Sequence, residues 1–145
     1  MKITDLKPTI VWKFFHQVTQ VPRPSKKEGK MIEFLESFAK EYKIAIKKDE
    51  AGNLLMSKPA TPGMEDRPVV VLQSHMDMVC EKNNGTKHDF DNDPIETIVD
   101  GEWLRANGTT LGADNGIGVA AELALLASDD IQHGPIECLF TVDEE

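Results

Sequence analysis

Apolar residues recur every three or four positions in two stretches near the start of the chain, as they do on one face of a helix. The first stretch, Ile10–Val18, predicts a short amphipathic helix that ends before the Pro22-Arg23-Pro24 break. The second predicts a helix that reaches about Tyr42. Ser25 and Glu28 have the spacing of a capping box, so we expect them to satisfy free amide groups at the start of this helix. The apolar stripe of the second helix consists of Met31, Leu35, Phe38, Ala39 and Tyr42.

Three strands are predicted in the middle of the chain. Ile44–Lys48 and Leu54–Lys58 flank a turn at Ala51-Gly52-Asn53. The run Val69-Val70-Val71-Leu72 follows a proline-bounded loop and is apolar at every position. Such a run favours a strand that is buried on both faces, as in a sheet covered by helices.

The last third of the chain continues the alternation of strand and helix patterns. Thr97–Val99 and Trp103–Arg105 flank Asp100-Gly101, a strong hairpin signal. Gly116–Ser128 is almost entirely apolar and predicts a buried helix, and Ile136–Val142 predicts another strand.

This alternation predicts an α/β fold, a sandwich with a central mixed sheet flanked by helices and with an inserted β-ribbon. A central-looking strand runs directly into Asp143-Glu144-Glu145, with nothing after it. We therefore expect residues 1–145 to be the front portion of a longer protein, incomplete at the C-terminus.

Composition and charge narrow the function classes. The chain has 145 residues, of which 40% are hydrophobic and 28% charged, an ordinary globular mix. No apolar run is long enough to span a bilayer and the start lacks the apolar core of a signal peptide, so we expect a cytoplasmic protein with Cys80 and Cys138 reduced. Residues 89–145 contain 14 acidic residues and one basic residue, Arg105, which disfavours nucleic acid and anionic membranes as partners. This acidic half suits a cation, although a solvated acidic face has the same composition.

The tripeptide His75-Met76-Asp77 follows the predicted buried strand. Residues two apart on an extended chain face the same way, so the imidazole and the carboxylate are expected to be neighbours. A metal-binding histidine is often held in this way by a carboxylate on its other ring nitrogen. A surface histidine beside an aspartate is the simpler alternative.

Two acidic clusters complete the candidate site. Asp114 lies in Gly112-Ala113-Asp114-Asn115-Gly116, ahead of the apolar helix, and suits either an N-cap or a rigidly held metal ligand. Glu144 and Glu145 follow the last strand, and adjacent acids are often merely solvated. Ligands of open α/β sheets nevertheless gather at the carboxyl ends of strands. One histidine with several carboxylates suits Zn²⁺ or Mn²⁺, and an adjacent carboxylate that is not a ligand could take the proton from water.

The remaining candidates have weaker signals. Cys80 is five residues beyond His75 and is expected to be a small buried thiol rather than a soft ligand. We interpret the other three histidines as structural or exposed. They are His16, His88 and His133.

Several motifs, taken together, resemble the co-catalytic di-zinc peptidases, and among them the dipeptidases of the aminoacyl-histidine (Xaa-His) type. The resemblance extends from about Pro22 to the end of the chain. The motifs are His75-Met76-Asp77-Met78-Val79, Trp103–Gly118 (WLRANGTTLGADNGIG), Thr141–Glu145, Lys82-Asn83-Asn84, His88-Asp89-Phe90 and Lys58-Pro59-Ala60-Thr61.

This resemblance implies a role for each candidate. His75 would bind one zinc ion, Glu145 the second, and Asp114 would bridge both. Asp77 would orient the imidazole of His75, and Glu144 would be the general base. The resemblance also implies that His75, Asp114 and Glu145 converge and that the Asp114–Asn115 peptide bond is cis.

The activity implied is metal-dependent hydrolysis of dipeptides by two divalent ions, most often Zn²⁺, with Mn²⁺ or Co²⁺ as alternatives. The partner would be a small peptide substrate, and the longer protein would be a homodimer. The family takes one further ligand for each metal, and a lid domain, from later sequence. We therefore expect residues 1–145 alone to be nearly inactive and prone to association. The alternative is a non-catalytic module that binds metal or a partner.

Overall fold

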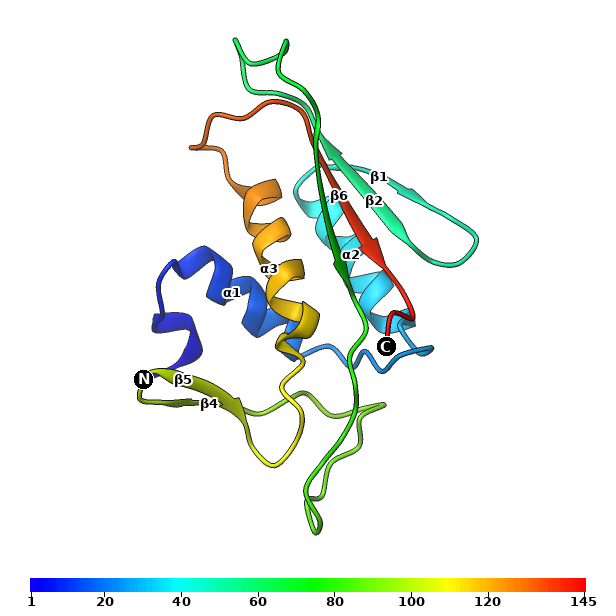
Figure 1. Ribbon diagram of the computed structural model, residues 1–145, viewed down its shortest axis with the longest axis vertical. Coiled ribbons are helices and arrows are strands. Elements are labelled where there is room, and N and C mark those ends of the chain that lie inside the picture. The colour runs from blue at the N-terminus through cyan, green and yellow to red at the C-terminus, as the bar shows by residue number, and fades with distance from the viewer.

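Three helices and a four-stranded sheet form the body of the molecule, with a two-stranded ribbon beside them (Figure 1). The computed structural model describes all residues from 1 to 145. In chain order the elements are the 3₁₀ helix η1 (Ile3–Asp5), α1 (Thr9–Thr19), α2 (Gly29–Glu41), β1 (Ala45–Lys48), β2 (Leu54–Lys58), β3 (Val70–His75), β4 (Thr97–Asp100), β5 (Trp103–Ala106), α3 (Ala113–Ala127) and β6 (Ile136–Thr141).

The sheet is mixed, with strand order β1-β2-β6-β3. β1 and β2 form an antiparallel hairpin, β2 pairs antiparallel with β6, and β6 pairs parallel with β3. Val70 lies opposite Ile136 and His75 lies opposite Thr141. The carboxyl ends of β3 and β6 therefore meet at the same edge of the sheet.

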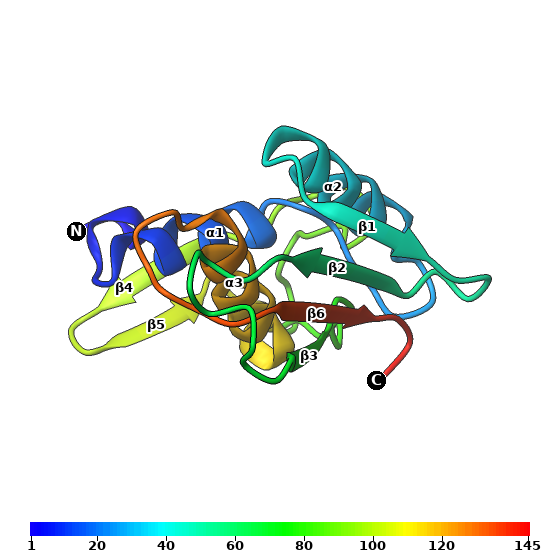
Figure 2. The ribbon, with the colours of Figure 1, turned by 90° about the horizontal axis from the view of Figure 1, so that it is seen from above.

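The hydrophobic core lies between the helices and one face of the sheet. Figure 2 shows α1, α2 and α3 together on one side of the strands. Alternate residues of β6, Ile136, Cys138 and Phe140, point into this core, as the period of a strand requires. The helices contribute Phe14, Phe15, Val18, Met31, Leu35, Phe38, Val119, Ala120 and Leu123.

The predicted α/β fold, with its mixed sheet and inserted ribbon, is confirmed. The prediction that Val69–Leu72 is buried on both faces is wrong. Val69, Val70 and Val71 are 52%, 52% and 56% exposed. β3 is an edge strand that pairs with β6 alone, and the helices described here cover only one face of the sheet.

The predicted boundaries of the helices and strands agree with the structure to within a few residues, but the capping box is wrong. α2 begins at Gly29, and its N-cap Glu28 makes no capping hydrogen bond with its side chain. The Ser25 hydroxyl donates instead to Asp77, 52 residues away in the sequence. A tertiary hydrogen bond thus replaces the local one that the spacing suggested.

The helix α3 packs between α1 and β3, which explains its nearly uniform apolar character. Glu122, in the middle of α3, is buried and accepts a hydrogen bond from the Ser74 hydroxyl. Its Oε1 atom is buried without a partner. Burial raises the pKa of Glu122 to about 7, against the opposing effect of the Ser74 hydrogen bond.

None of the helices combines the length and the apolar character that a membrane-spanning segment needs.

Candidate metal centre

The candidate site forms where β3, β6 and the start of α3 come together. Beyond the last strand pair, the Met76 main-chain N–H donates to the Thr141 carbonyl over 2.8 Å. The backbone then places His75 beside the segment Asp143–Glu145. The expectation that these groups gather at one end of the sheet is confirmed.

His75 is held on both sides of its ring. Its side chain is only 7% exposed. The Nδ1 atom lies 3.1 Å from the main-chain oxygen of Asp77 and 3.3 Å from its carboxylate Oδ1. The Nε2 atom faces the other way, 2.9 Å from Oδ1 of Asp114 and 3.7 Å from Oε2 of Glu144. This arrangement fixes the ring through Nδ1 and directs Nε2 toward the carboxylates.

The electrostatics of His75 reflect this environment. Burial is the largest single influence and disfavours the charged ring, but the hydrogen bond with Asp114, the charge and main-chain oxygen of Asp77 and the charge of Glu144 together outweigh it. The pKa of His75 is therefore raised. The acidic surroundings favour positive charge at this position, whether a proton or a metal cation supplies it.

His75, Asp114 and Glu145 form a group that could hold a metal ion. One ligand atom from each lies within 4.8 Å of the other two. Their predicted convergence is confirmed, although Asp114 and Glu145 are exposed and only His75 is buried. An imidazole with two carboxylates is a donor set that zinc accepts, so the residues present fit a divalent metal. Their role as ligands stays a prediction.

Asp114 is not the N-cap of α3, the alternative that its position suggested. Gly112 occupies the N-cap, and Asp114 has non-helical backbone angles within the first turn. The Asp114–Asn115 peptide bond is cis, as expected. The Asp114 side chain remains 83% exposed, with one oxygen directed at His75. Its carboxylate is thus available to a ligand rather than to the helix.

Asp77 is the most deeply placed acid of the site, with a side chain that is 0% exposed. Its Oδ2 atom accepts hydrogen bonds from the Ser25 hydroxyl at 2.7 Å and from the main-chain N–H groups of Glu144 and Glu145 at 3.1 Å each. Burial is the largest single influence and opposes ionisation, but the hydrogen bonds from the Ser25 hydroxyl and from main-chain N–H groups, those of Glu145 and Glu144 first, together outweigh it and lower the pKa of Asp77. Asp77 is therefore an ionised anchor.

Sequence reasoning missed the part played by residues before α2. Arg23 is 1% exposed, and its guanidinium donates to the main-chain carbonyls of Met76, Asp77 and Gly112. Burial lowers the pKa of Arg23 to about 10, although nearby charges, including that of Asp77, oppose this effect. No local pattern marks an arginine between two prolines as buried.

The two cysteines are free thiols, as predicted. Cys138 is buried in the core, where burial and the charge of Glu122 raise its pKa to about 12. Cys80 is half-buried rather than buried as predicted, and it contacts the Met78 carbonyl rather than the metal-binding group. The remaining histidines also lie outside that group.

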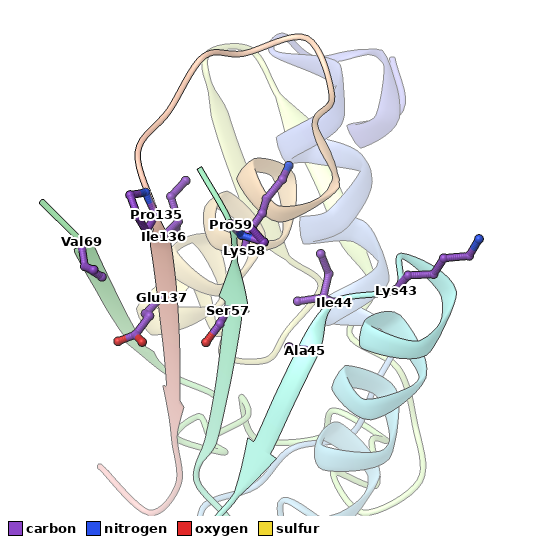
Figure 3. Close-up of a pocket in the computed structure, with 10 residues that line it drawn as sticks. All are labelled: Lys43, Ile44, Ala45, Ser57, Lys58, Pro59, Val69, Pro135, Ile136 and Glu137. Carbon is purple, nitrogen blue, oxygen red and sulfur yellow. The ribbon is translucent and has the colours of Figure 1, made fainter. Parts of the chain in front are cut away.

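A cavity of about 360 Å³ lies at the opposite end of the sheet, where β2 ends and β6 begins (Figure 3). It contains none of the predicted site residues. Its lining consists of Lys43, Ile44, Ala45, Ser57, Lys58, Pro59, Val69, Pro135, Ile136 and Glu137.

No protein-family model matches the chain. It is 49% identical over 144 residues to the cytosol non-specific dipeptidase of Escherichia coli (strain K12), covering 99% of this chain and 30% of that protein. The crystal structure of aminoacylhistidine dipeptidase from Vibrio alginolyticus superposes with a TM-score of 0.98 at 51% identity, covering 100% of this chain and 30% of that one.

A more distant structure shares the fold. A tripeptidase from Staphylococcus aureus matches with a TM-score of 0.74 at 24% identity, over 93% of this chain and 36% of that one. The chain thus spans about a third of the length of the proteins that it matches. In sequence and in fold, residues 1–145 are similar to two proteins named as dipeptidases, the class that the motifs resemble.

Proposed function

We propose that this chain provides metal-binding and catalytic groups of a metal-dependent dipeptidase that hydrolyses Xaa-His dipeptides. The observation that carries the proposal is the convergence of His75, Asp114 and Glu145 at the carboxyl ends of β3 and β6. The similarity to two proteins named as dipeptidases supports the same reaction class.

This group would hold two divalent ions, with Zn²⁺ preferred and Mn²⁺ or Co²⁺ as alternatives. His75 would bind one ion through Nε2, Glu145 would bind the other, and Asp114 would bridge them. The Asp114 side chain is 83% exposed and only its Oδ1 atom has a hydrogen-bond partner, His75 Nε2, which supports a bridging role. When bound, such ions polarise a peptide carbonyl and lower the pKa of water near neutral pH.

Glu144 is the proposed general base. Its carboxylate is 56% exposed and lies beside the ligand group, 3.7 Å from the His75 ring. Asp77 accepts a hydrogen bond from the Glu144 main-chain N–H, which positions the residue without occupying its side chain. The free carboxylate can therefore take a proton from water and deliver it to the leaving amine.

The ligand count sets the activity expected of residues 1–145 alone. Each ion would share Asp114 and have one further protein ligand, whereas catalytic zinc normally has three. We therefore expect metal binding with little or no turnover. This same count supports the alternative, a module that binds metal without catalysis. For the longer dipeptidase we propose a cytoplasmic location, a small peptide as partner and a homodimeric state.

Metal stoichiometry tests the assignment most directly. Calorimetric titration of the protein with Zn²⁺ should find two ions per chain. His75→Ala and Glu145→Ala should each remove one ion, and Asp114→Asn should weaken both. Glu137→Ala, at the opposite end of the sheet, is the matched acidic control (Figure 3).

Hydrolysis of an Xaa-His dipeptide, with and without chelator, then separates the enzyme from the binding module. Slow turnover that the chelator removes supports the dipeptidase, and metal binding without turnover supports the module. Turnover that is indifferent to chelator would overturn the metal mechanism. Rapid chelator-sensitive turnover would contradict the low activity expected of these residues.

A further inference from the structure

Three segments that are distant in sequence carry the proposed ligands, and one further segment contacts all of them. Residues 75–77 follow β3, residues 112–114 begin α3, and residues 143–145 follow β6. The Arg23–Glu28 segment, which connects α1 to α2, forms hydrogen bonds with each of the three. We propose that Arg23, Ser25 and Glu28 are positioning residues that hold the ligand-bearing segments together, an inference that rests on the proposed metal site.

Arg23 joins the first two segments. Its Nη1 atom donates to the carbonyls of Met76 at 3.1 Å and Asp77 at 3.2 Å, and its Nη2 atom donates to the carbonyl of Gly112. The guanidinium thus bridges the backbone after His75 and the backbone two residues before Asp114. The planar guanidinium group reaches both backbone segments at once, which the single ammonium group of a lysine does less well.

The backbone of the segment adds to this contact. The Met78 main-chain N–H donates to the Arg23 carbonyl over 3.1 Å, and Pro24 forms a parallel bridge with Met78. The segment therefore runs alongside the chain that leaves His75, in the manner of a short strand.

Ser25 joins residues 75–77 to residues 143–145 through the side chain of Asp77. The Ser25 hydroxyl donates to Oδ2 of Asp77 over 2.7 Å. That same oxygen accepts the main-chain N–H groups of Glu144 and Glu145. Ser25 thus helps to fix the carboxylate that contacts both the His75 ring and the Glu145 backbone.

Glu28 holds the third segment directly. Its Oε1 atom accepts the main-chain N–H of Asp143 over 2.8 Å and that of Lys26 over 3.0 Å. The Glu28 residue is only 7% exposed. Its acceptor oxygen therefore ties the chain before Glu144 and Glu145 to the beginning of α2.

Ordinary loop packing would also place polar contacts here, but it would not select these acceptors and donors. The hydrogen bonds that Arg23, Ser25 and Glu28 form outside their own segment all reach the ligand-bearing segments. None of these hydrogen bonds involves a proposed ligand side chain. None of the three side chains thus occupies a ligand atom of His75, Asp114 or Glu145, although all of them hold the backbone nearby. Loss of a contact should therefore weaken metal binding more than it weakens the fold.

Paired variants separate this role from general stability. Ser25→Ala removes the hydroxyl donor and Ser25→Thr retains it. Glu28→Ala removes the acceptor, and Glu28→Gln keeps an amide oxygen that can accept the same two N–H groups. Ser57→Ala, in the cavity at the far end of the sheet, is the control (Figure 3). For each protein, Co²⁺ affinity, the visible spectrum of the Co²⁺-loaded form and the melting temperature of the metal-free form are measured.

We expect Ser25→Ala and Glu28→Ala to weaken Co²⁺ binding by about 10- to 100-fold, the range found for groups that orient metal ligands. Ser25→Thr and Glu28→Gln should restore most of the affinity and the spectrum. Equal Co²⁺ affinity and spectra in all five variants would overturn the positioning role while leaving the metal site intact. Affinity that merely follows the melting temperature would also overturn it. Absence of Co²⁺ binding by the unsubstituted protein would instead refute the proposed site, and this inference with it.

Discussion

The buried carboxylate of Asp77 lies 3.3 Å from the His75 ring through one oxygen and accepts the Glu145 main-chain N–H over 3.1 Å through the other. Two proposed ligands, 70 positions apart in the numbering of the chain, are thus fixed by one side chain. The orientation of the His75 ring and the position of the Glu145 backbone therefore both depend on the Asp77 carboxylate.

Replacing Asp77 by Asn should weaken metal binding by about 10- to 100-fold. The amide has only one acceptor oxygen, and its NH₂ group would face donors in a buried place, so both ligand segments lose their common anchor. Titration with Zn²⁺ measures the affinity. Asp143→Asn, an exposed change in the same segment, is the control. Affinities equal to that of the unsubstituted protein would show that Asp77 does not organise the site.

Replacing Glu144 by Gln should leave Zn²⁺ binding intact and remove chelator-sensitive hydrolysis. General base catalysis typically contributes 10²–10⁴-fold, so any turnover that residues 1–145 support should fall by about that factor. Parallel calorimetry and dipeptide assays measure the two quantities. If Glu144→Gln weakened Zn²⁺ binding as much as Glu145→Ala does, Glu144 would be a ligand rather than a base.

Replacing Gly112 by Ala should destabilise the protein by more than its backbone angle alone explains. Gly112 has φ of 70°, and an added Cβ would lie 2.7 Å from the Met78 sulfur and against the Arg23 guanidinium. The left-handed backbone costs about 1–2 kcal/mol and the overpacking about 1–3 kcal/mol more. Urea unfolding of Gly112→Ala measures the sum.

Gly63 provides the matched control for this substitution. It has φ of 85°, and nothing lies within 4 Å of its added Cβ. Gly63→Ala should therefore show the backbone penalty alone. Equal losses in the two variants would mean that the Gly112 backbone tolerates a methyl group beside Arg23.

Replacing Glu122 by Gln should stabilise the protein at neutral pH and change how its stability depends on pH. Burial raises the pKa of Glu122 to about 7 from its ordinary value of 4.5. Between those values the folded chain binds a proton that the unfolded chain has released, so the free energy of unfolding falls as pH rises. The loss is on the order of 3 kcal/mol across this window.

Urea unfolding at pH 5 and pH 8 measures this difference. In the Glu122→Gln variant, residue 122 no longer titrates, and its amide oxygen can still accept the hydrogen bond from Ser74. The contribution of Glu122 to the pH dependence of the free energy of unfolding should therefore disappear. Other groups, His75 included, titrate in both proteins and cancel in the comparison. Identical pH slopes for the two proteins would show that Glu122 is ionised in the fold.

Much of the architecture could be predicted because it is encoded locally. The stripe Met31-Leu35-Phe38 and the alternation along Ile136–Val142 follow the periods of helix and strand, and both are found. The convergence of His75 and Glu145 could be predicted because both lie at the ends of strands whose carboxyl ends meet, whereas Asp114 lies in the first turn of α3 and its proposed role came from the resemblance. What could not be predicted depends on tertiary contacts. Ser25 has the spacing of a cap but bonds Asp77, and the apolar run Val69–Leu72 does not reveal that it forms an edge strand.

The parallel pairing of β3 with β6 has a consequence for the order of events in folding. In the sequence, the ribbon β4–β5 and the helix α3 lie between these two strands, so pairing β3 with β6 closes a long loop. Closing a long loop has a high entropic cost, so we expect this pairing to form late in folding. His75 and Glu145 approach each other only once this loop has closed. A cation that binds them therefore recognises the finished sheet and not its precursors, and by mass action it would stabilise the closed state by RT ln(1 + [M]/Kd).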